Sequence, residues 1–94
     1  MDDRLLKRAG MAKTLLADAA AQINDAADLD DYRKHVARDE LELALDCLEN
    51  LGDRSSVSAD FWWNLKKAAE VLGLDARYDA LRLKRREAQR ASSG

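Results

Sequence analysis

Proline is absent from this 94-residue sequence, glycine occurs only four times, and aromatic and β-branched residues are few. Proline and glycine are the residues that most disfavour a helix interior, so their scarcity removes the main obstacle to helix formation. Alanine, leucine, glutamate, lysine and arginine, which favour helices, are abundant. We therefore expect an all-α protein, a single compact bundle of about four helices that spans residues 1–94 as one domain.

Cysteine and histidine each occur once, which restricts the chemistry that the chain can perform. A lone Cys47 excludes an intrachain disulfide and a cysteine-based zinc site. The spacing of Asp31, His35 and Asp39 places them on one helix face, but three such ligands without a contribution from a second helix make a weak metal site. No second histidine is present to serve Cys47 as a base, and there is no glycine-rich phosphate loop. We expect no enzyme activity, no cofactor and no metal.

Long apolar runs are also missing, and none approaches the ~20 residues of a membrane span. The opening Met-Asp-Asp-Arg-Leu-Leu lacks the basic-then-apolar order of a signal peptide. We therefore expect a cytoplasmic protein without a membrane partner.

Apolar residues recur with the three-four spacing of amphipathic helices along the first half of the chain. A first helix is expected from about Asp3 to Asn24 or Ala27, with a narrow seam rich in alanine. We expect this seam to pack onto the protein's own helices; the alternative is a homodimer that pairs through it as a coiled coil. A second helix is expected from about Asp28 to Leu51, with a break near residues 36–38 and with Gly52 as its C-terminal stop.

The second half of the chain predicts two further helices. Residues 53–58 read as a loop, and Ser58 is suited to cap the third helix. Gly73 should end that helix, and the fourth should begin near Asp75. Residues 83–94 are polar and basic, and we expect them to fray.

The most distinctive pattern is a stripe of carboxylates spaced three and four residues apart, which we name the acid stripe: Asp39, Glu42, Asp46, Glu49 and Asp53. This spacing places all five on one side of a helix, where each like-charged pair costs roughly 0.2–0.5 kcal/mol in isolation. No lysine or arginine lies between Arg38 and Arg54 to offset that cost. The stripe favours a surface that awaits a basic partner; the alternative is an ordinary solvated helix face.

Charge is distributed unevenly along the chain although the net charge is only −2. Residues 15–53 contain eleven acidic and three basic residues and carry −8, whereas residues 77–94 contain six basic and two acidic residues and carry +4. This asymmetry points to interactions with charged partners rather than to a particular fold.

Trp63 is a second candidate contact residue. It projects about 160° away from the inward-facing Phe61, among Lys66, Lys67 and Glu70 on its helix. An exposed tryptophan among charges is a typical hot spot in protein interfaces. The alternative is that Trp63 packs under the first helix or a loop.

Residues 68–75 resemble the beginning of a helix-turn-helix unit that is followed by a basic helix. Such a unit needs apolar residues about six and nine positions after the turn glycine, but Asp79 and Arg82 stand there. The acid stripe would also repel phosphate. Nucleic-acid binding is therefore disfavoured, and a DNA-binding regulator stays as the third alternative.

The segment Arg38-Asp39-Glu40-Leu41-Glu42-Leu43-Ala44-Leu45-Asp46 resembles a motif of small bacterial immunity proteins, the MafI-like and related proteins encoded beside polymorphic or contact-dependent toxins. That motif has an acidic residue and then a Leu-Ala-Leu-acid run on an exposed helix. A loop ending in serine follows, here Ser58, and then a helix that closes with a Gly-Leu turn, here residues 72–74. The resemblance covers residues 29–81, and Glu42 stands where a glycine is expected in many relatives.

The resemblance implies a protein that binds a cognate toxin domain, often a basic nuclease, and neutralises it. The acid stripe would supply the electrostatic contacts, Trp63 the apolar anchor, and Asp31 and Glu40 contacts at the rim. A homodimerising interaction module is the main alternative. We expect an immunity protein, or antitoxin, of a polymorphic or contact-dependent inhibition system.

Overall fold

The computed structural model describes residues 3–24 and 26–93, with side-chain surroundings for residues 7–24 and 27–91. All of the regular structure in this part of the chain is helical: α1 (Asp3–Ala20), the short 3-10 helix η1 (Ala26–Leu29), α2 (Asp30–Ala37), α3 (Leu41–Asp53), α4 (Ala59–Leu72) and α5 (Asp75–Ser93). The predicted all-α class is confirmed. The count differs, because five α-helices take the place of about four.

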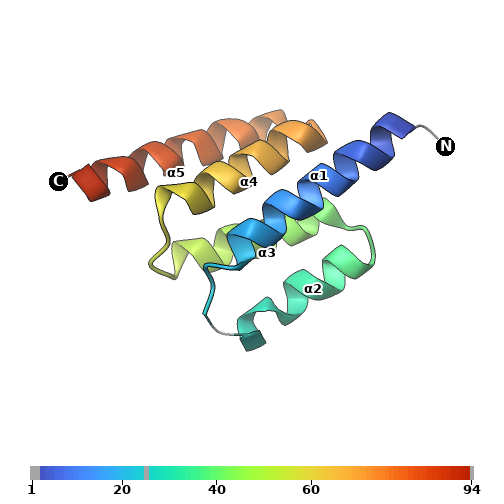
Figure 1. Cartoon of the computed structure of the whole chain (residues 1–94). Coiled ribbons are helices and arrows are strands. Elements are labelled where there is room, and N and C mark those ends of the chain that lie inside the picture. The colour runs from blue at the N-terminus through green and yellow to red at the C-terminus, as the bar shows by residue number, and fades with distance from the viewer. Residues whose placement is uncertain (1–2, 25, 94) are drawn as a thin grey trace.

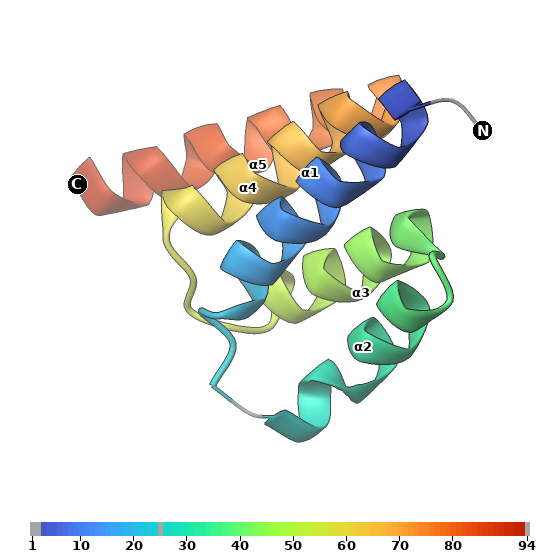
Figure 2. The same cartoon turned by 45° about the vertical axis from the view of Figure 1, so that its right-hand side comes forward.

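The helices form two layers (Figures 1 and 2). In both views α4 lies between α1 and α5, and these three helices make one layer. Helix α3 packs beneath α1 and α4, and α2 lies beside α3 on the outside. The core between the layers contains the fully buried side chains of Leu16, Leu45, Leu48, Phe61, Leu65 and Leu81.

The extra helix comes from the break between α2 and α3. Asp39 lies in the left-handed region with a φ of 58°, which a helix interior does not tolerate. The Glu40 amide donates to the carbonyl of His35 at 2.8 Å and closes the turn. The break expected near residues 36–38 is thus confirmed.

The alanine-rich seam of α1 faces the inside of the molecule. Ala12, Leu16 and Ala19 are completely buried, and Ile23 is nearly so. The seam therefore packs onto the protein's own helices, as expected. Ala12 and Ala19 are therefore covered by the protein's own helices in this structure.

Gly52 does not stop the second helix, so that prediction is wrong. Helix α3 continues to Asp53, and Gly52 is buried inside it. A Cβ atom at this position would lie 2.3 Å from Cε1 of Phe61 and 2.8 Å from Cη2 of Trp62. Glycine is present because the rings of α4 pack directly against the backbone of α3.

The two ends of α4 lie where the sequence predicts them. Gly73 ends the helix in the left-handed conformation, with a φ of 74°. Ser58 occupies the N-cap position, but its hydroxyl donates to Oε1 of Gln22 at 3.1 Å instead of bonding to the helix. The serine thereby ties the start of α4 to the end of α1.

Residues 83–93 continue α5 instead of fraying. Fully buried Leu81 and the partly buried Ala88 hold the inner face of this helix against the core. Tyr78 also packs against the core, and the half-buried cations of this helix are Arg77, Lys84 and Arg85. Within residues 3–24 and 26–93, no helix has the length and apolar character that crossing a membrane requires.

Candidate functional site

The acid stripe begins in the turn before α3 and follows one side of that helix. Glu42, Asp46, Glu49 and Asp53 belong to α3, whereas Asp39 lies in the preceding turn. Asp39 pairs with Lys13 of α1, with 2.6 Å between Oδ1 and Nζ. The helix therefore brings four of the five predicted carboxylates onto one face, and the turn adds the fifth at its end.

Arg77 of α5 lies against the middle of the acid stripe. Its guanidinium holds the Asp46 carboxylate with both terminal nitrogens, and Nη2 donates to Oδ2 at 3.0 Å. Its Nε is 3.5 Å from Oε1 of Glu42, and Nη1 is 3.9 Å from Oε2 of Glu49. One arginine thus lies within ion-pair distance of three carboxylates, and its contact with Asp46 has the two-pronged geometry that makes such pairs strong.

Lys84 of α5 binds the last two carboxylates of the acid stripe. Its ammonium donates to Oε1 of Glu49 at 2.9 Å and to Oδ2 of Asp53 at 2.8 Å. It also lies 5.1 Å from the centre of the Trp62 ring, within the range of a cation–π contact. Together with Arg77, it makes a charged seam between α3 and α5.

The structure corrects the expectation that nothing offsets the repulsion within the acid stripe. The offsetting cations come from a helix more than thirty residues later in the chain. Arg77 and Lys84 are seven residues apart, so two helical turns place them on the same flank of α5, next to Leu81. This spacing was visible in the sequence and is the signal that could have revealed the seam.

Lys84 gives the seam a pH dependence. Burial by itself lowers the pKa of Lys84, but its hydrogen bonds to Asp53 and Glu49, together with their charges, outweigh burial and raise the pKa above its ordinary value. A cation whose pKa is raised by folding stabilises the native state below the unfolded pKa of about 10.4 and loses that contribution as the pH rises through the folded value.

We expect the free energy of unfolding to fall as the pH rises above about 10.5, and to fall less in Lys84→Gln than in the wild type. Urea titrations at pH 8, 10 and 11 measure the difference. Arg90→Gln, an exposed cation on the same helix, is the matched control and should keep the wild-type profile. Equal profiles for wild type and Lys84→Gln would show that the seam adds no stability.

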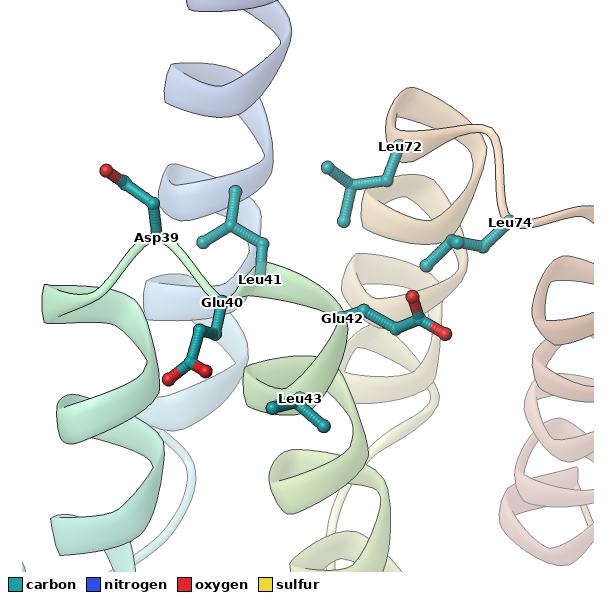
Figure 3. Close-up of a pocket in the computed structure, with 7 residues that line it drawn as sticks. All are labelled: Asp39, Glu40, Leu41, Glu42, Leu43, Leu72 and Leu74. Carbon is teal, nitrogen blue, oxygen red and sulfur yellow. The ribbon is translucent and has the colours of Figure 1, made fainter.

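The beginning of α3 remains open to solvent, unlike the middle of the acid stripe. The side chains of Asp39 and Glu42 are 74% and 58% exposed, whereas that of Glu49 is only 22% exposed. Between the start of α3 and the end of α4 lies a hollow of about 420 Å³ lined by Asp39, Glu40, Leu41, Glu42, Leu43, Leu72 and Leu74, which we name the acidic hollow. Figure 3 shows Leu72 and Leu74 on the α4 side and Glu42 extending from α3 toward them.

The acidic hollow combines exposed carboxylates with apolar surface. Leu43 is 44% exposed, although it is a large apolar side chain, and Leu72 and Leu74 are half-buried. Carboxylates at the edge of an apolar surface suit an arginine or lysine whose aliphatic stem packs on the leucines while its charge reaches the acids. The sequence showed the acids but did not connect them with Leu72 and Leu74, because the end of α4 meets the start of α3 only in the folded chain.

Trp63 is half-buried and does not join the acid stripe. It lies on the outer side of α4 and lines a separate hollow of about 380 Å³ with Asp60, Asn64 and Arg85. Trp62, its neighbour in sequence, is the tryptophan that packs near the charged seam. The six predicted contact residues therefore form two sites rather than one.

The other candidates from the sequence are the possible metal ligands around His35, and Cys47. His35 Nδ1 is 3.3 Å from Oε1 of Glu40. Across the described residues, no group of three or more His, Cys, Asp or Glu side chains is arranged to hold a metal ion. Cys47 is half-buried, and burial, together with the nearby Asp31 charge, raises the pKa of its thiol and so disfavours the thiolate.

Comparison with protein-family models, curated proteins and solved structures finds no match to this chain.

Proposed function

We propose that this chain is a binding protein that neutralises a cognate toxin domain with a basic surface, and that the acidic hollow is its main contact. The observation that carries this proposal is the pair of exposed carboxylates, Asp39 and Glu42, at the rim of an apolar hollow that includes the exposed Leu43. Preformed carboxylates beside apolar surface favour a protein partner with arginine or lysine, since charge steers the encounter and apolar contact adds affinity.

The other three carboxylates of the acid stripe have a smaller role in this proposal. Asp46, Glu49 and Asp53 already bind Arg77 and Lys84, so a toxin cation reaches them only by replacing a cation of α5. Asp39 and Glu42 also pair with cations, Lys13 and Arg77, but their side chains are 74% and 58% exposed, so we assign them the larger contribution to affinity. A basic nuclease fits this surface, because carboxylates would compete with phosphate for its lysines and arginines.

The resemblance of residues 38–46 to the immunity-protein motif supports the same proposal. Those residues form the turn before α3 and its first half, which include the exposed part of the acid stripe. The glycine expected at position 42 in many relatives is Glu42 here, the most exposed carboxylate on α3 among those in ion pairs. We assign to Glu42 a role in the choice of toxin.

The experiment is capture of the tagged chain from lysate of its source bacterium with identification by mass spectrometry, followed by calorimetric titration of the purified toxin domain. We expect Asp39→Asn with Glu42→Gln to weaken binding about 10- to 100-fold at low salt, the effect of losing one or two interfacial ion pairs. Asparagine is chosen at position 39 because it accepts the left-handed backbone there.

The matched control is Asp18→Asn with Glu87→Gln, which removes two exposed carboxylates from α1 and α5. It should bind like the wild type, and both double variants should melt within a few degrees of it. Charge reversal at Asp46 and Glu49 is avoided because it breaks the charged seam. Wild-type affinity of the Asp39/Glu42 variant would refute the proposed contact.

A further inference from the structure

The flank of α5 opposite the charged seam carries cations that have no acidic partner. Arg82 and Arg85 form no ion pair with another described residue, and neither does Lys66 of α4. Lys67 pairs with Glu70 at 3.3 Å. The acid stripe is thus partly balanced by Lys13, Arg77 and Lys84, whereas Arg82, Arg85 and Lys66, which we name the basic cluster, form no ion pair in the described part of the chain.

The cluster is close enough for its charges to repel one another. Lys66 is only 8% exposed, although it is a lysine, and its Nζ lies 5.8 Å from the centre of the Tyr78 ring. Burial and the charges of Arg85, Lys67 and Arg82 lower the pKa of Lys66, and the charge of Glu70 opposes them. An anion bound here would relieve the repulsion.

A hollow opens beside this cluster, between α4 and α5. Its lining residues are Asp60, Trp63, Asn64 and Arg85, and its volume of about 380 Å³ falls in the range of small-molecule sites. The Arg85 Nε is buried and has no hydrogen-bond partner among the described residues, so this donor is not used there. A half-buried indole and an unpaired guanidinium therefore line one surface hollow.

An aromatic ring beside cations is the arrangement with which proteins bind single-stranded nucleic acids, since bases stack on the ring and phosphates bind the cations. We propose that this hollow binds a nucleotide unit, with its base stacked on Trp63 and its phosphate held by Arg85. Asp60 fixes the orientation, because its carboxylate repels phosphate and directs it toward α5. Asn64 is placed to hydrogen-bond the edge of the base. Base pairs of an intact duplex offer no exposed face for stacking, so the proposed ligand is a single strand or a free nucleotide.

The test is fluorescence anisotropy of the full chain with a labelled mixed-sequence RNA octamer at 50 mM salt, and calorimetry with AMP. We expect Trp63→Leu to weaken octamer binding about tenfold or more, as loss of one stacked base does. Arg85→Gln should weaken octamer binding several-fold. It should also reduce the slope of log affinity against log salt concentration by the amount that corresponds to about one phosphate contact. Arg90→Gln removes the same charge farther along α5 and should change affinity less than twofold.

Two readouts keep the proposal falsifiable if Trp63→Leu folds poorly. In nitrogen–proton NMR spectra of the wild type, the ligand should shift the indole signal of Trp63 and leave that of the buried Trp62 in place. The Asp39→Asn/Glu42→Gln variant should bind the octamer at least as tightly as the wild type, because neither residue lines this hollow, so failure of the toxin proposal leaves this one standing.

AMP binding that depends on Trp63 would identify a mononucleotide pocket, whereas binding of the octamer alone would identify a strand site. Equal competition by poly-glutamate and octamer, with no effect of Trp63→Leu, would reveal a general polyanion surface and overturn the proposal. Absence of binding to both AMP and the octamer would overturn it as well.

Discussion

The variant Arg77→Glu is expected to lower the free energy of unfolding by about 3 kcal/mol. The substitution removes the two-pronged contact with Asp46 and places a carboxylate next to Glu42 and Glu49. The side chain of Arg77 is 30% exposed, so water screens only part of the resulting repulsion. Urea-induced unfolding followed by circular dichroism measures the effect.

A charge swap separates the ion pair from other effects of this substitution. Arg77→Glu combined with Asp46→Arg restores opposite charges across the seam and should recover at least half of the lost stability. Arg90→Glu, the same reversal at an exposed position of α5, should change stability by less than about 0.5 kcal/mol. If the two reversals cost the same, the charged seam does not hold α5 to α3.

Gly52→Ala is expected to destabilise the protein by about 2 kcal/mol, although alanine is the better helix former. The helix propensity favours alanine by about 1 kcal/mol, but the new Cβ meets the ring of the fully buried Phe61 at 2.3 Å. Overpacking of this kind costs typically 1–3 kcal/mol, and the short distance places this case at or above the upper end. Thermal and urea unfolding both measure it.

Gly10→Ala is the matched control, because Gly10 also lies inside a helix and a Cβ there has no atom within 4 Å. That variant should gain about 0.5–1 kcal/mol. In a Phe61→Leu background the cost of Gly52→Ala should shrink, since the smaller side chain leaves room. A Gly52→Ala variant as stable as Gly10→Ala would contradict the close packing of α3 on α4.

Local patterns in the sequence predicted most of the helices. The three-four spacing of apolar residues identified the seam of α1, and Gly73 identified the end of α4, because a left-handed cap depends on one residue. The break before α3 was also anticipated near residues 36–38. These features depend on neighbours within a few positions, which the sequence displays directly.

Gly52 and the charged seam could not be assigned in the same way, because their causes lie in another helix. A glycine near a helix end predicts a stop, and only the rings of α4 explain why this one lies inside the helix instead. Likewise, an unbroken row of acids predicts an open surface until the position of α5 is known. The sequence contained both cations, but not the packing angle that brings them to α3.

The candidate site was predicted in part. Asp39 and Glu42 are the most exposed carboxylates of the acid stripe, whereas Asp46 and Glu49 mainly bind Arg77 and Lys84 of α5. Trp63 lies beside the basic cluster rather than beside the acids. The charge asymmetry seen along the sequence therefore separates into an acidic hollow and the basic cluster on α4 and α5.

Inhibition of the purified toxin domain by the purified chain tests the central claim most directly. Residual toxin activity is measured while the chain is added from a tenth of the toxin concentration to a tenfold excess. Our account predicts complete inhibition by the wild type near equimolar ratio, the same for Asp18→Asn/Glu87→Gln, and a 10- to 100-fold higher requirement for Asp39→Asn/Glu42→Gln. Equal inhibition by all three proteins, or no inhibition by the wild type at a tenfold excess, would contradict it.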